Sequence, residues 1–147
     1  MRRIIFIMLI LAAGVLIFRV FTKEAISAEE FTLQMEAKGY TVRNIYDPNK
    51  VTSLYAEHGD FSVSFMVYET IREATSSYGI MRGFIRGRPD LSYREIHGVN
   101  FDKITGTARG VLGHFRVLVR VDNTILFIAT NMENRATAEA LLNTLGY

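Results

Sequence analysis

The chain contains no cysteine among its 147 residues. It therefore forms no disulfide, and a domain placed outside the cytoplasm would have to be held together by packing alone. The missing thiol also excludes a lipoprotein anchored through a lipidated cysteine after Leu11-Ala12-Ala13-Gly14. Any attachment to a membrane must be made by the polypeptide itself.

Catalytic signatures are missing as well. The sequence contains none of the spacings Gly-x-Ser-x-Gly, Ser-x-x-Lys and His-Glu-x-x-His, which place a nucleophile or a metal beside its base. Its only histidines are His58, His97 and His114, and their spacing matches no metal-ligand motif. We therefore predict no catalytic residue, no metal and no cofactor, and we favour a protein that is not an enzyme.

The positive charge of the chain is confined to its beginning. Residues 1–28 contain four basic residues and one acidic residue, whereas the remaining 13 basic and 14 acidic residues give the rest of the chain a net charge of −1. A nucleic-acid-binding domain carries a surplus of lysine and arginine that neutralises phosphates. We therefore expect no nucleic-acid partner.

A long hydrophobic run follows two arginines at the N-terminus. After Arg2-Arg3, the fifteen residues Ile4 to Phe18 include no charged or strongly polar side chain. A helix needs about 20 residues to cross a hydrocarbon core of about 30 Å, and Arg19 can extend its side chain toward the interface so that Val20-Phe21 lengthens the run. We predict a transmembrane helix with these membrane residues: Ile4, Ile5, Phe6, Ile7, Leu9, Ile10, Leu11, Val15, Leu16, Ile17 and Phe18.

The basic flank predicts the orientation of this helix. Cytoplasmic flanks of membrane helices are richer in arginine and lysine, so the N-terminus is expected in the cytoplasm. Residues 1–25 are then a membrane anchor, and residues 26–147 form one domain outside the cytoplasm. The segment also fits a signal peptide that is cleaved after Ala25-x-Ser27 or after Ile26-x-Ala28, and in that alternative the domain is secreted.

A helix-capping pattern beside the run favours the retained anchor. Ser27-x-x-Glu30 has the spacing of a capping box, and Ile26 with Phe31 occupies the positions of a hydrophobic staple. Cleavage after Ala28 would discard this cap. The pattern therefore favours a chain that keeps its leader.

Local patterns predict alternating helices and strands beyond the anchor. Strands are indicated by alternating apolar and polar residues, and helices by apolar residues three and four apart. The predicted elements are a helix at 28–38, strands at 40–45, 51–57 and 61–68, a helix from the capping box Thr70-x-x-Glu73 to Ile85, strands at 91–96, 101–107, 114–121 and 124–130, and a helix ending at Gly146. Short connections imply antiparallel pairing, so we predict an α+β fold with one antiparallel sheet and helices on one face, in the order α-βββ-α-ββββ-α.

The densest basic cluster lies around the end of the second predicted helix. Arg82 and Arg86 share a helix face, and Arg88 and Arg94 follow. Such a cluster can contact anionic lipid headgroups or another polyanion beside the anchor. It is equally compatible with a solvated helix end, where the helix dipole favours positive charge.

The last predicted hairpin carries a second candidate surface. Arg116, Leu118 and Arg120 alternate along one strand, and Leu126 and Ile128 follow on the next. An exposed apolar group bordered by charge is typical of a partner surface. The same residues would instead lie under a helix if these strands are buried on both faces.

These observations define two functional hypotheses. The first is an anchored domain that binds a protein, a peptide or an envelope polymer without catalysis, because no chemical motif stands out. The alternative is a secreted or anchored hydrolase or small-ligand-binding domain whose cleft is formed only in the folded chain. A shallow apolar surface in the folded chain would favour the first hypothesis, and a deep pocket with convergent polar groups would favour the second.

Overall fold

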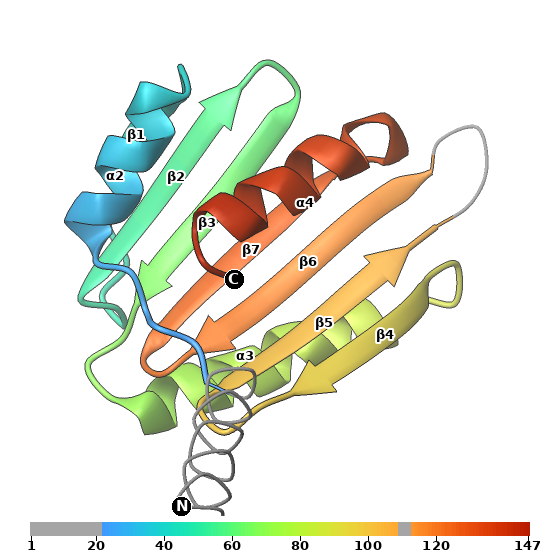
Figure 1. Ribbon diagram of the computed structural model, residues 1–147. Coiled ribbons are helices and arrows are strands. Elements are labelled where there is room, and N and C mark those ends of the chain that lie inside the picture. The colour runs from blue at the N-terminus through green and yellow to red at the C-terminus, as the bar shows by residue number, and fades with distance from the viewer. Residues whose placement is uncertain (1–21, 109–112) are drawn as a thin grey trace, which may run out of the picture.

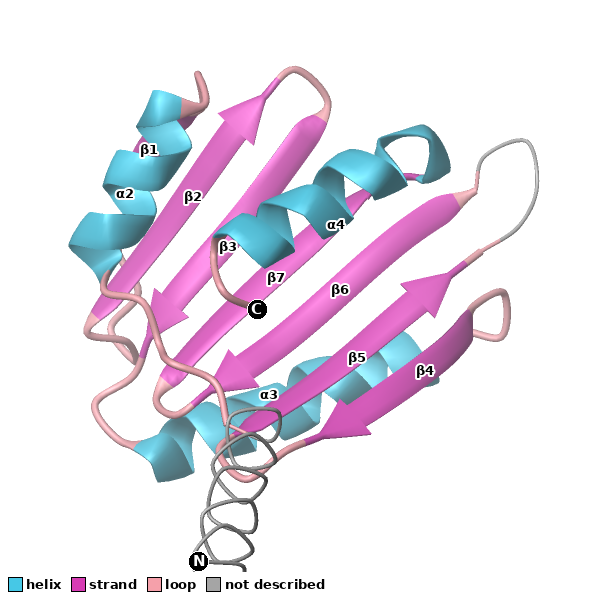
Figure 2. Cartoon of the chain, in the orientation of Figure 1, coloured by secondary structure: helices cyan, strands magenta, loops and turns pink. Residues whose placement is uncertain are grey.

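The computed structural model describes residues 22–108 and 113–147. In this part of the chain, seven antiparallel strands form one sheet with the order β1-β2-β3-β7-β6-β5-β4 (Figures 1 and 2). The strands are β1 Thr41–Asn44, β2 Thr52–His58, β3 Phe61–Val67, β4 Ser92–His97, β5 Phe101–Thr107, β6 His114–Val121 and β7 Thr124–Asn131. The helices are α2 Ala28–Ala37, α3 Ile71–Arg86 and α4 Arg135–Thr144, the last preceded by the 3₁₀ turn η1 Met132–Asn134.

The predicted order of elements after the anchor is confirmed. Tight turns join the hairpins where the sequence suggested them: Gly59 adopts φ 56° between β2 and β3, and Asp122 adopts φ 49° between β6 and β7. Both values lie in the left-handed region, which glycine and aspartate tolerate better than most residues. These local signals place the strand ends within one or two residues of the prediction.

Helix starts follow the predicted caps, with one difference. The capping box at Thr70 is complete, because its hydroxyl accepts from the Glu73 N–H and the Glu73 carboxylate accepts from the Thr70 N–H, both at 3.2 Å. At α2 the Ser27 hydroxyl accepts from the Glu30 N–H at 3.0 Å. The Glu30 carboxylate pairs with Gln34 instead of returning to Ser27, so only half of that box forms.

The prediction that helices cover one face of the sheet is wrong. Helices α2 and α4 lie on the front face in Figure 1, and α3 lies behind the sheet. The reason is visible in β6, where Val117 and Val119 are buried toward α2 and α4 while Leu118 between them is buried toward α3. Side chains alternate across a strand, so a strand that is apolar at consecutive positions needs cover on both faces.

The two faces have separate cores. The front core joins Phe31 of α2 and Leu142 of α4 to the sheet, and Phe31 stacks on Phe65 with ring centroids 4.7 Å apart. The back core joins Tyr78 and Ile85 of α3 to the sheet. Burial of each large side chain contributes about 1.5–3 kcal/mol to folding, so both layers stabilise the domain.

Residues 1–21 of the predicted anchor, which include all the membrane residues from Ile4 to Phe18, lie outside the described residues. Among the helices of residues 22–108 and 113–147, none combines the length and the hydropathy needed to cross a bilayer. The division of the chain into an anchor and a domain at residues 25 and 26 therefore stays a prediction.

We expect Phe31→Ala to lower the free energy of unfolding by about 3–5 kcal/mol, because it removes a fully buried ring and leaves a cavity against Phe65. Leu33→Ala on the same helix is the matched control, since Leu33 is 62% exposed. It should cost less than about 0.5 kcal/mol beyond helix propensity. Urea unfolding of the full chain in detergent measures both, and equal effects would contradict the packing of α2 on the sheet.

Candidate functional site

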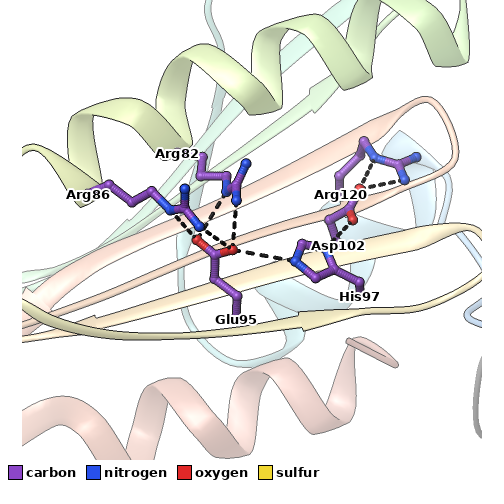
Figure 3. Close-up of polar contacts among 6 residues, drawn as sticks. All are labelled: Arg82, Arg86, Glu95, His97, Asp102 and Arg120. Atoms are coloured by element: carbon purple, nitrogen blue, oxygen red, sulfur yellow. Dashed lines mark hydrogen bonds and ion pairs between the residues drawn. The ribbon is translucent and has the colours of Figure 1, made fainter.

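The most concentrated group of charges lies between α3 and the edge strand β4 (Figure 3). Its centre is the Glu95 carboxylate, whose side chain is only 12% exposed. Arg82 donates to both of its oxygens at 3.0 and 2.8 Å, and Arg86 donates to the same two oxygens at 2.6 and 3.0 Å. Two guanidinium groups one helical turn apart therefore share one carboxylate.

A second pair continues the group across the sheet. Asp102 of β5 accepts two hydrogen bonds from Arg120 of β6, at 2.9 and 2.7 Å. His97 lies between the two pairs, with Nδ1 2.8 Å from Asp102 and Nε2 3.4 Å from Glu95. With its proton on Nδ1, the imidazole donates to Asp102 and points its other nitrogen toward Glu95. We call these six residues, shown in Figure 3, the charge network.

The network holds its carboxylates in the ionised form. Hydrogen bonds from Arg82 lower the pKa of Glu95 to about 2, against the opposing effect of burial, and Arg86 adds to the lowering. Burial raises the pKa of Asp102, but hydrogen bonds from His97 and Arg120 outweigh it and the net shift is downward. A general acid must hold a proton near neutral pH, and these two carboxylates do not.

Tyr78 of α3 lies within the field of the same carboxylates. Burial, with further contributions from Asp102 and Glu95, raises the pKa of its hydroxyl, so the group stays protonated. The hydroxyl is buried and finds no hydrogen-bond partner in the described part of the chain. The Tyr78 hydroxyl is neutral and buried, and this gives no indication that it takes part in a reaction. The network is therefore best described as a brace that ties α3 to the sheet edge.

The predicted basic cluster is thereby divided, and two carboxylates neutralise half of the charge of its four arginines. Arg82 and Arg86 pair with Glu95, and Arg88 pairs with Asp90 at 2.8 Å. These residues lie toward the C-terminal end of α3, and the connection that holds Arg88 and Asp90 leads to the start of β4 (Figure 1). Residue 23, where the described chain continues from the predicted anchor, lies at the opposite end of β4, against Asn100. The arrangement gives no support to a lipid contact of this cluster beside the anchor.

The second predicted surface is not an exposed patch. Leu118 has no exposed area and lies beneath α3, and Arg120 is 8% exposed and paired with Asp102. Arg116 is partly exposed on the same face of the sheet, opposite Gly106. Burial therefore removes Leu118 and Arg120 from the surface that we predicted.

Leu126 and Ile128 were assigned to the wrong face. In the register of the hairpin, Val117 pairs with Ile128 and Val119 with Leu126, which places both residues in the front core. Leu118 pairs with Phe127 on the back face. The alternative that these strands are buried on both sides is the one the structure shows.

The histidines lie at separate places. Nδ1 of His58 lies 3.1 Å from the carbonyl oxygen of Gly39, His97 belongs to the charge network, and His114 is exposed at the start of β6. Among residues 22–108 and 113–147, no group of three or more His, Asp or Glu side chains is arranged to hold a metal ion.

A hollow of about 470 Å³ lies between the start of α3 and the β1–β2 connection. Its lining includes Lys50, Val51, Tyr68, Glu73 and Ser77. Pockets for small ligands are commonly 300–1,000 Å³ but are mostly apolar and enclosed. This hollow is open and polar, and the Glu73 carboxylate already caps α3, so it lacks a free pair of acid and base.

The junction between the predicted anchor and the domain is bound tightly to a loop. The Asn100 side chain accepts from the Lys23 N–H at 3.0 Å and donates to the Lys23 carbonyl at 2.7 Å. Its amide nitrogen also donates to Asp122 at 3.1 Å, and the Lys23 ammonium lies 5.9 Å from the Phe101 ring centroid. We call this arrangement the Asn100 clamp. It fixes the direction in which the chain reaches the domain.

Sequence patterns did not indicate Glu95, Asp102, Tyr78 or Asn100 as members of a site. Each of them contacts residues from other elements of the fold. A single acidic residue in a strand or a single Asn in a turn occurs too often in sequences to indicate a site. The basic cluster was a local signal of the charge network, but its acidic partner Glu95 lies 13 residues from Arg82 and 9 residues from Arg86 along the chain.

Comparison with known proteins adds no family to this description. The chain matches no protein-family model, no curated protein and no solved structure.

We expect Glu95→Gln to lower the free energy of unfolding at pH 7 by about 1–3 kcal/mol, because it leaves two arginines without their charged acceptor. A lowered pKa stabilises the fold above the unfolded value, near 4.5, and this stability is lost as the pH falls toward about 2. The wild type should therefore lose more stability than Glu95→Gln between pH 5 and 2, by these pKa values.

Urea unfolding at a series of pH values tests this expectation. Glu139→Gln is the matched control, because Glu139 forms an ion pair with Arg135 in which both side chains are 49% exposed. Exposed pairs contribute about 0–1 kcal/mol. A Glu95→Gln protein with the same pH dependence as the wild type would show that the network does not brace the fold.

Proposed function

We propose that this protein is a single-pass membrane protein with its N-terminus in the cytoplasm, and that its domain, residues 26–147, binds a protein or peptide outside the cytoplasm without catalysis. The Asn100 clamp is the observation that carries the proposal. The clamp lies almost directly after the hydrophobic run in the sequence, since Thr22 alone separates Phe21 from Lys23. The clamp thus holds the residue that follows the hydrophobic run by two positions directly against the domain.

The clamp favours an anchor over a cleaved signal. Cleavage after Ser27 or Ala28 would remove the Lys23 backbone from Asn100 and the Ser27 cap from α2. It would also remove Ala25 and Ile26, which pack against the front core. Each loss exposes apolar area or frees hydrogen-bonding groups, so the domain is more stable when the leader is kept.

Binding is favoured over catalysis by the surface of α3. Ile80 and Phe84 lie one helical turn apart and are 62% and 71% exposed. On a helix they occupy the flank opposite to Arg82 and Arg86, which point toward β4. We call Ile80 and Phe84 the apolar flank of α3.

Part of the back face of the sheet is also open. On its back face, Tyr55 of β2 with Ser62 and Ser64 of β3 are partly exposed, and no hydrogen bond of their side chains is found within the described residues. Exposed apolar side chains and free hydroxyl groups on the same face of the domain suit a peptide segment, which offers both apolar side chains and amide groups. An envelope polymer would use the hydroxyl groups more than the apolar flank.

The hollow near Glu73 and Ser77 supports the alternative function, a small-ligand-binding or hydrolytic domain. Its volume is within the range of ligand sites, and it lies at the N-terminal end of the same helix. We place it second, because the wide opening and the engaged carboxylate of Glu73 provide neither enclosure nor acid-base chemistry.

We expect the full chain, tagged after Tyr147, to remain in the membrane fraction after washing with high salt. Its mass should be that of residues 1–147, and the tag should be digested by protease added outside the cell. A product that starts at Ala28 or Glu29 and appears in the medium would contradict the anchor. Membrane fractionation with mass spectrometry of the tagged protein gives the result.

We expect a photo-crosslinking residue at Phe84 to form an adduct with a partner in the native membrane, while the same residue at Leu33 forms none. Leu33 is a matched control because it is 62% exposed and apolar, but lies on α2 over the other face. Ile80→Asp should abolish the adduct without altering the unfolding curve. Equal adducts at both positions would point to unspecific capture and against the apolar flank as the binding surface.

A further inference from the structure

One end of the sheet differs from the other in the character of its loops. The register Thr52↔Val67↔Thr124↔Val121↔Phe101 runs across the sheet at the end where Lys23 meets Asn100. The connections at this end are residues 45–51, 68–70, 98–100 and 122–123. We call it the junction end, and it runs along the lower side of the domain in Figure 1.

Exposed apolar side chains gather at the junction end. The connections and element ends there hold six of the ten large apolar residues that are exposed in the described part of the chain: Ile45 48%, Tyr46 89%, Val51 65%, Ile71 55%, Ile96 43% and Val99 70%. The described turns at the opposite end, which leave out residues 109–112, expose mainly polar groups, among them Lys38, Asp60, Asp90 and Glu133. A surface that contacts only water is not expected to gather its exposed apolar side chains at one end of the domain.

The path of the chain sets how close this end lies to a membrane. Phe21 is the last residue of the apolar stretch, and two residue steps to Lys23 span at most about 7 Å. Each headgroup layer is about 5–8 Å thick, from the difference between the whole bilayer and its hydrocarbon core. With Phe21 at the edge of the hydrocarbon, Lys23 lies at headgroup depth. Asn100 and its neighbour Val99 lie there with it, because the clamp holds Lys23 directly.

We propose that the junction end rests on the lipid bilayer, with Val99 and Ile96 inserted beside the anchor and Tyr46 and Val51 forming a second contact at the other side of the sheet. The inference rests on the proposed membrane anchor. Two separated contacts and one covalent attachment determine the tilt of the domain. Tyrosine is favoured at this depth, because its ring is apolar and its hydroxyl reaches water.

The contact is apolar rather than electrostatic. Among the described residues, the basic ones at this end are Lys23, Lys50, Arg72 and Lys103, the partner of Ile96 in the sheet, and the acidic ones are Glu24, Asp47, Glu69, Glu73 and Asp122. The acidic groups are in excess, and Lys50 is already paired with Asp47. Anionic lipid is therefore not needed for the contact, and the arginines of the charge network take no part in it.

The absence of cysteine allows a direct test on the full chain. Four single-cysteine variants carry an environment-sensitive fluorophore: Val99→Cys and Tyr46→Cys at the junction end, Asp60→Cys at the opposite end, and Phe84→Cys as an exposed apolar control on α3. Each is reconstituted in phosphatidylcholine vesicles with and without a lipid that carries a nitroxide quencher near its headgroup. Vesicle flotation is measured on the same samples.

The labels at positions 99 and 46 should be quenched at least threefold more strongly than those at 60 and 84, and 20% anionic lipid should not change the ratio. A chain that floats with the vesicles but shows equal quenching at all four positions would keep its anchor and overturn the bilayer contact. Quenching that appears only with anionic lipid would overturn its apolar character. A chain that does not float would overturn the anchor and this inference together.

Discussion

Burial on both faces of the β6–β7 hairpin is the constraint on which the architecture depends. Leu118 and Ile125 face α3, while Val117 and Leu126 face α2 and α4. Sheet faces that are apolar on both sides must be covered on both sides, so the helices are divided between two layers. Helix α3 covers mainly β6 and β7, together with Met66 near the end of β3, so Tyr55, Ser62 and Ser64 stay partly exposed on the back face. Part of the back face of β2 and β3 is thus uncovered because α3 lies over β6 and β7, the strands that are apolar on both faces.

The charge network attaches the last turns of α3 to the sheet, where apolar packing is sparse. The last turns of α3 lie beside β4, an edge strand with few apolar residues to hold them. Glu95 supplies the attachment, because its carboxylate accepts four hydrogen bonds from two guanidinium groups. Ion pairs of this kind stabilise only when the donors and acceptors match in geometry, and the paired guanidinium groups meet that condition. A basic cluster that suggests lipid binding in sequence is, in the folded chain, part of the internal framework.

Local patterns predicted the elements well, because caps, turns and alternation act over a few residues. The complete capping box at Thr70 and the tight turn at Asp122 are examples. Predictions that depended on the pairing register of neighbouring strands were wrong. Leu126 was placed on the same face as Leu118, although a two-residue turn pairs Leu118 with Phe127 and turns Leu126 to the other side. The clamp between Lys23 and Asn100 joins residues 77 positions apart and left no local signal.

If the proposed anchor is present, the clamp would also limit where a binding partner can be found. A flexible linker would let a domain search a volume, whereas a domain held directly on its anchor moves only in the plane of the membrane. The 16-residue helix α3 spans about 24 Å, so on the proposed bilayer contact the apolar flank near its C-terminal end would stand no farther than roughly that height above the lipid. With the proposed anchor in place, a partner must either reside in the same membrane or extend to within that height of it. Encounter would then depend on lateral diffusion, and its frequency on how densely both proteins populate the membrane.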